Sequence, residues 1–206
     1  MAEPPWPPSG PPPAAASPKA DAAAACLERL VADGATAVAA APPPASAGGC
    51  GIRAPVRLSS ITAQGETVNL PDRPLVACEF ASVLADYVRL IVAPLAKATL
   101  GARVAAIETG PGYDCRTQDR IAGAKISAHA KGLAVDFAAI TLSDDRRILV
   151  GRQTSPERTA CFRAIRTGAC GWFTTVLGPG SDAFHTTNMH LDTGLHGLNV
   201  NFRICQ

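Results

Sequence analysis

The sequence predicts an α+β domain: a small, mostly antiparallel sheet with flanking helices. Three observations predict it. Helical periodicity dominates the first half of the chain up to Gly101, short strand-like segments follow, and one further helix interrupts them. An order in which helices come first and a cluster of strands follows is typical of α+β domains and not of a regular βαβ alternation. At 206 residues, one domain of ordinary size with a tail is expected.

The N-terminal residues 1–20, "MAEPPWPPSGPPPAAASPKA", are rich in proline and alanine. Proline fixes φ and removes a backbone donor, so this stretch predicts a disordered, partly polyproline-like tether. The folded domain is expected over residues 21–206. Its first element is a short helix over 20–35 that ends at Gly34, followed by an extended segment over 52–61.

The longest helical pattern covers residues 78–100, and Pro94 is expected to kink or divide it. A buried strand over 102–108 follows. A second helix is predicted over 155–170, because Ser155 is a good cap and Pro156 suits the first turn. Further short strands are predicted at 133–142, 146–150, 172–178 and 189–193.

Composition excludes several classes of partner. The net charge is +2 and 17% of residues are charged, without a polybasic arm, so nucleic acid and acidic membrane surfaces are not indicated. No stretch approaches the roughly 20 apolar residues of a membrane span. The N-terminus also lacks the basic start and apolar centre of a secretory signal, so an exported form would need a signal that lies upstream or was removed. A monomer is expected.

Seven cysteines without a CxxC pair favour structural disulfides and an oxidising compartment such as the periplasm or cell envelope over scattered buried thiols. We expect one pair to bracket the first helix and its following loop, a second to join the long helix to the turn at 109–115, and a third to fix the C-terminus. The expected pairs are Cys26–Cys50, Cys78–Cys115 and Cys170–Cys205, with Cys161 free.

Two short regions hold all four histidines. "ISAHAKGLAVDF" (126–137) places His129 and Asp136 around Gly132, and "HTTNMHLDTGLHG" (185–197) contains His190. A carboxylate in the apolar run around Asp136 is costly unless it is paired or bound to a cation. Two histidines, one carboxylate and an open position make a ligand set typical of catalytic zinc, so we predict a Zn²⁺ site at His129, Asp136 and His190. Structural histidines are the alternative.

These residues resemble a known group. The pattern S-x-H-x-x-G-x-A-x-D from Ser127 to Asp136, with a later H-x-D, is similar to the motif of zinc D-Ala-D-Ala metallopeptidases and murein endopeptidases, which share a fold with the hedgehog domain. More closely, "GYDCR", "SAHAKGLAVDF", "TVLGPGSDAFH", "HLD" and "RIC" resemble the extensin-like C-terminal domain proteins of proteobacteria, over roughly residues 25–206.

The resemblance implies a hedgehog-like zinc fold in which metal-activated water attacks an amide carbonyl. The base in such relatives is a Glu three residues before the last ligand, or histidines five and two residues before it. Those positions hold Thr187, His185 and Asn188 here, so His185 is the candidate base. Asn188 can form hydrogen bonds but cannot take a proton near neutrality. Arg116 matches a substrate-binding arginine, with an ordinary ion pair as its alternative.

Other polar residues nearby are given supporting roles. Asp192 lies two residues beyond His190 on the same strand face and is expected to orient a ligand imidazole. Ser127 is expected to brace its loop rather than act as a nucleophile, and His196 to be structural or exposed. The segment "LGPGSD" (177–182) predicts a chain reversal that brings Asp182 and His185 towards the site.

The sequence therefore predicts a zinc-dependent peptidase-like protein of the cell envelope that cleaves stem peptides or cross-links of peptidoglycan. Peptidoglycan or other wall material is the expected partner. Two alternatives stay open. One is a domain that uses zinc for stability or for binding wall material without catalysis, and the other is a structural envelope protein that holds no metal.

Overall fold

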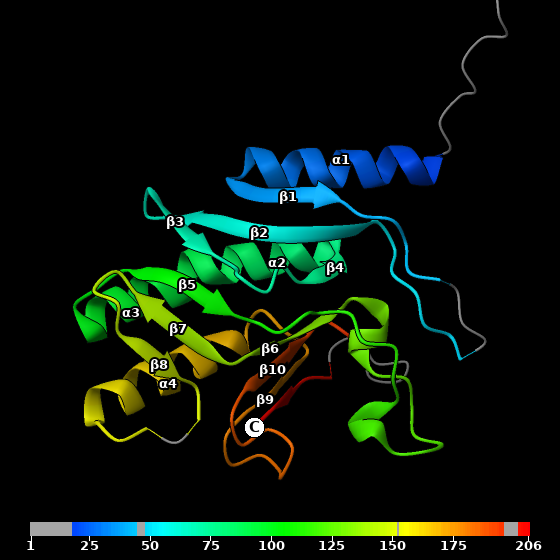
Figure 1. The fold of residues 1–206 in the computed structure, drawn as a ribbon. Helices are drawn as coiled ribbons and strands as arrows, with labels where there is room; N and C mark the ends of the chain where they lie inside the picture. The colour runs from blue at the N-terminus through cyan, green and yellow to red at the C-terminus, as the bar shows by residue number, and fades with distance from the viewer. Residues whose placement is uncertain (1–17, 45–47, 152, 196–201) are drawn as a thin grey trace, which may run out of the picture.

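The computed structural model describes residues 18–44, 48–151, 153–195 and 202–206. Its architecture is α+β, as predicted, with helices packed around two sheets (Figure 1). No helix in these described ranges is long and apolar enough to cross a membrane.

The first helix, α1 (Pro18–Ala32), begins two residues earlier than predicted, so 18–20 belong to the helix and not to a tether. The rest of the predicted tether, residues 1–17, lies outside the described residues. The chain turns through Gly34, whose φ of 89° is in the left-handed region that glycine adopts readily. Leu30 is buried against the core, and α1 runs alongside β1 (Ala35–Ala39) in Figure 1.

The larger sheet has seven strands among the described residues, in the order β1-β2-β3-β5-β7-β8, with β4 also paired to β2. Its pairs are antiparallel except β3–β5. The prediction located β2, β5, β7 and β8 but missed β1, β3 and β4, the three strands that pair with β2. The remaining bounds are β2 (Pro55–Ala63), β3 (Glu66–Asn69), β4 (Leu75–Ala77), β5 (Val104–Glu108), β7 (Ala139–Leu142) and β8 (Arg147–Leu149).

The smaller sheet has four described strands in the order β11-β9-β10-β6, in which β11 and β9 are parallel. The single strand predicted over 133–142 is divided at Ala138, and its two halves belong to different sheets. Asp136 N–H and Ala138 N–H donate to carbonyls of Thr109 and Glu108, which links the two sheets at this point. The bounds are β6 (Ala134–Phe137), β9 (Thr175–Leu177), β10 (Met189–Asp192) and β11 (Ile204–Cys205).

The long predicted helix is continuous but changes its hydrogen-bond pattern ahead of Pro94. It comprises α2 (Cys78–Tyr87), a π-helical turn η1 (Val88–Val92) and α3 (Ala93–Leu100). Ala93 N–H donates to Val88 O, five residues back. Proline has no N–H and crowds the preceding turn, so widening that turn lets the helix pass Pro94 without breaking.

The core lies between these helices and the sheets. Phe80, Leu84 and Tyr87 on α2 are fully buried, and Tyr87 packs edge-on against Phe173 with ring centres 5.2 Å apart. The Tyr87 hydroxyl donates to Ile165 O in α4 (Pro156–Ala169) at 2.9 Å, so burial leaves no donor unpaired there. As predicted, Ser155 caps α4 by accepting from Arg158 N–H.

Six cysteines form three disulfides, and two of the predicted pairings are wrong. Cys26 pairs with Cys78, Cys50 pairs with Cys115, and Cys170 pairs with Cys205, as expected for the last pair. Cys161 is free and buried. The error follows from missing β1, which pairs with β2 and lengthens the path of the chain between α1 and Cys50. Cys26 instead meets the first residue of α2.

Candidate metal centre

His129 lies in a short 3₁₀ turn, η3 (Ala128–Lys131), that folds the chain back before β6. Ser127 begins this turn, and its Oγ accepts from His129 N–H at 3.3 Å. Gly132 ends the turn with a φ of 65°, and a Cβ at Gly132 would lie only 2.9 Å from Ala77 N. Only glycine therefore fits between η3 and the start of α2.

Asp136 on β6 and His190 on β10 are direct partners in the antiparallel register. Side chains of directly opposed residues point to the same face of a sheet and lie close together. The flanking Val135 and Phe137 are fully buried in the core, so the alternation of the strand directs Asp136 to the other face. The side chain of Asp136 is 32% exposed, so this carboxylate is less buried than its apolar sequence context predicted.

The three predicted ligands come together. Nε2 of His129 lies 3.2 Å from Nδ1 of His190 and 3.4 Å from Oδ2 of Asp136, and Nδ1 of His190 lies 3.3 Å from Oδ1 of Asp136. Ligand atoms bound tetrahedrally to zinc at its usual N and O distances would be about 3.3 Å apart. Each of His129, Asp136 and His190 offers one ligand atom, these atoms lie within 4.8 Å of one another, and the three residues could hold one metal ion.

Hydrogen bonds on the far side of each imidazole select the nitrogen that faces the cluster. Nδ1 of His129 donates to the carbonyl of Gly112 at 2.7 Å, which leaves Nε2 as the ligand atom. Nε2 of His190 donates to Oδ2 of Asp192 at 3.1 Å, which leaves Nδ1. Such outer partners fix the ring orientation and tautomer of metal-binding histidines. The arrangement suits metal ligation by both rings.

The cluster is strongly coupled electrostatically. Burial alone would lower the pKa of His190, but hydrogen bonds to Asp136 and Asp192 outweigh it and raise this pKa to about 9. Burial would raise the pKa of Asp136, yet hydrogen bonds to His129 and His190 hold it well below its usual range. Without a metal, a proton on His190 therefore supplies the positive charge that the two carboxylates need.

His185 stands beside this cluster, with its ring centre 5.6 Å from that of His190. Its Nδ1 lies 2.8 Å from both carboxylate oxygens of Asp182, which also accepts from the backbone N–H groups of Phe184 and His185. The turn at 177–182 thus supplies a carboxylate that orients His185. The turn formers around Asp182 predicted that it approaches the site but not that it binds His185, because an Asp in a turn is common for other reasons.

Three further residues singled out from the sequence are Arg116, Asn188 and His196. The guanidinium of Arg116 pairs with Asp114, Nε to Oδ2 at 3.0 Å, and donates to Thr117 O, which is the ion-pair alternative. Oδ1 of Asn188 is buried and has no hydrogen-bond partner among the described residues. His196 lies outside the described residues.

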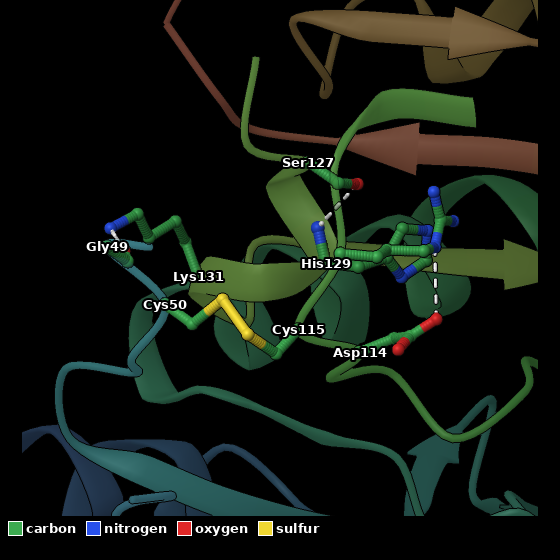
Figure 2. The surroundings of a disulfide bond; sticks show 8 residues. Gly49, Cys50, Asp114, Cys115, Ser127, His129 and Lys131 are labelled. Atoms are coloured by element: carbon green, nitrogen blue, oxygen red, sulfur yellow. Dashed lines mark hydrogen bonds and ion pairs between the residues drawn. A yellow bond between two sulfur atoms is a disulfide. The ribbon is translucent and has the colours of Figure 1, made fainter. Parts of the chain in front are cut away.

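The Cys50–Cys115 disulfide joins two segments of the chain that both contact the turn carrying His129 (Figure 2). Cys115 belongs to the loop whose Gly112 carbonyl accepts from His129, and Asp114 N–H in the same loop donates to His129 O. On the other side, residues next to Cys50 bind the turn itself: Gly51 N–H donates to Ala130 O, and Lys131 donates to Gly49 O. Two segments joined by one covalent bond therefore hold η3 in place.

A cavity of about 720 Å³ adjoins the supporting residues of the cluster. Ser127 and Asp192 line it, together with Lys125 and the exposed side chains of Leu195 and Phe202. Its mixed polar and apolar lining is suited to a ligand larger than a single small ion.

Comparison with known families identifies the chain. The profile of the family described as "Extensin-like protein C-terminus" matches residues 24–206. The chain belongs to this family. The match agrees with the resemblance seen over roughly residues 25–206. Comparisons of this extensin-like domain with curated proteins and with solved structures found no significant match.

Proposed function

We propose that this extensin-like domain is a zinc-dependent hydrolase of the cell envelope that cleaves amide bonds in peptidoglycan stem peptides or cross-links. The observation that carries the proposal is the cluster of His129, Asp136 and His190. The two imidazole nitrogens lie 3.2 Å apart, and each lies 3.3–3.4 Å from a different oxygen of the Asp136 carboxylate, which is close to the spacing of ligand atoms around tetrahedral zinc. Each imidazole donates its other ring N–H to a carbonyl or a carboxylate, as histidines that bind metal ions usually do. The likeness of the S-x-H-x-x-G-x-A-x-D motif to zinc D-Ala-D-Ala peptidases supports the choice of zinc and of an amide substrate.

Three protein ligands leave a position open, which is the feature that separates catalytic zinc sites from structural ones. Zinc bound there would act as a Lewis acid on a carbonyl and lower the pKa of water. His185 would take up the proton released from the attacking water. Its Nδ1 is engaged by Asp182, so its Nε2 carries the free lone pair. Arg116 is proposed to bind a carboxylate of the substrate.

The envelope location rests on the cysteines. Three disulfides fit an extracellular or envelope protein, because the cytosol keeps thiols reduced. The folded domain is proposed to extend from the start of α1 to residue 206, with the Pro/Ala-rich residues that precede α1 as a tether. The cavity beside Ser127 and Asp192 is proposed to accommodate part of the wall polymer.

Digestion of defined muropeptides by purified, zinc-loaded protein tests the proposal. Cleavage that stops on addition of a chelator and returns on addition of zinc is the expected result. Bound zinc without cleavage of any muropeptide would favour the alternative, a zinc-stabilised domain that binds wall material. Asn188 is consistent with this alternative, because it stands where catalytic relatives carry a second histidine. Absence of bound metal after zinc loading would reject both and leave a structural role.

A further inference from the structure

A second cavity, of about 370 Å³, lies between α4 and the segments around Gly151 and Pro179. Its floor is apolar and consists of the buried side chains of Val150, Phe162 and Met189. Arg163 and Arg166, one helical turn apart on α4, supply its charge. No Asp or Glu is among the described residues that line it, so the cavity is positive and has no internal counter-charge.

Arg166 has no carboxylate partner in the described part of the chain. The side chain is half-buried against Gly178, and Nη1 donates to the carbonyl of Pro179 at 3.0 Å. Burial lowers the pKa of Arg166, because no anion offsets the loss of water. A guanidinium carries five N–H donors, so most of them are left for a partner that the described chain does not provide.

The same face of α4 continues into an adjoining cavity of about 420 Å³. The two cavities share Gln153, Thr159 and Arg163, and the second one reaches Ser155 at the start of α4. Arg163 is exposed and therefore free to move towards a ligand. The groove thus offers a cationic end over an apolar floor and neutral hydrogen-bonding groups beyond it.

We infer that this groove binds a carboxylate carried by a short apolar group, with Arg166 and Arg163 holding the carboxylate and Phe162 and Met189 contacting the apolar part. The planar fork of a guanidinium matches a carboxylate in shape. The apolar floor disfavours a fully polar anion such as phosphate, which would lose hydration there. This site is separate from the His129, Asp136 and His190 cluster and does not depend on the proposed hydrolysis.

NMR titration of the isotope-labelled full chain with butyrate tests the inference, with butyramide as the neutral match in shape. Butyrate should shift the amide signals of 150–166, and butyramide and inorganic phosphate should bind at least about tenfold more weakly, since an ionic hydrogen bond is lost or hydration is not replaced. Equal binding of butyrate and butyramide would overturn the inference. Tighter binding of phosphate would overturn the assignment to a carboxylate.

Two variants locate the site. Arg163→Ala and Arg166→Gln should each weaken butyrate binding about tenfold or more, while Arg158→Ala, an arginine of the same helix outside both cavities, should bind as wild type does. Arg163 is exposed, so its variant remains informative even if Arg166→Gln disturbs the turn at Pro179. Undiminished binding by the folded Arg163→Ala and Arg166→Gln proteins would refute the site. Metal content should be unchanged in all three variants.

Discussion

Asp192 and His190 lie two residues apart on β10, and Oδ2 of Asp192 is 3.1 Å from Nε2 of His190. Asp136 faces the opposite nitrogen of the same ring at 3.3 Å. His190 is thus placed between two carboxylates, one positioned to share a metal with it and one positioned to hold it.

Metal binding should depend on pH because it displaces a proton. In the metal-free protein the pKa of His190 is raised to about 9, so its Nδ1 is protonated at neutral pH. A metal requires the neutral ring, and one proton must leave for each ion bound. The affinity of the protein for the metal ion should therefore increase about tenfold per pH unit from about pH 7 and level off near pH 9. Competition against a chelator of known affinity at several pH values measures this slope. A flat profile over that range would contradict the assignment of Nδ1 as a ligand.

Asp192→Asn should weaken zinc binding about 10-fold to 100-fold, the usual effect of removing an outer partner of a ligand histidine. The change keeps the size of the side chain but removes the charge that holds the imidazole N–H. Asp182→Asn is the matched control, because Asp182 bonds His185 and touches no predicted ligand. Both affinities can be measured by calorimetry. Equal losses in the two variants would show that Asp192 has no special link to the metal.

The sequence identified the elements with strong periodicity and the residues whose chemistry is unusual for their context. Asp136 stood out because a carboxylate in an apolar strand requires compensation, and the structure places His129 and His190 beside it. The carbonyl of Gly112 could not be predicted in the same way, since a backbone group carries no residue-type signal. The course of the loop that contains Gly112 brings this carbonyl to His129.

The errors in the fold also have physical causes. β1, "ATAVA", is short, lies at a sheet edge and has alanine at three of its five positions, a residue that strands disfavour, so little in the sequence indicated it. Missing that strand led directly to the wrong partners for Cys26 and Cys50. The division at Ala138 was invisible as well, because strands in either sheet have the same alternation of side chains.

The corrected disulfides yield a third prediction. Replacing Cys50 and Cys115 by serine should weaken zinc binding, because the two segments that hold η3 are then no longer joined. Replacing Cys26 and Cys78 is a matched control: the sequence separations are 65 and 52 residues, so the entropic losses in stability are similar, about 2–4 kcal/mol each. Thermal unfolding should show comparable losses for both double variants. Zinc affinity measured well below the unfolding temperature should fall only without Cys50–Cys115, and equal affinities would reject a link between this bond and the site.

The proposed base gives the fourth prediction. His185→Ala should slow muropeptide hydrolysis about 100-fold to 10,000-fold, the usual contribution of a general base, while zinc content stays the same. Asp182→Asn should slow it less, because the imidazole remains but loses the carboxylate that orients it. Asn188→His should raise activity if Asn188 has replaced a second proton acceptor, and Asn188→Ala is its control for the loss of the amide alone. Single-turnover rates with zinc-loaded protein separate these effects from changes in substrate binding. Equal rates for His185→Ala and wild type would show that the proton goes elsewhere. Loss of zinc from His185→Ala would instead make His185 a metal ligand.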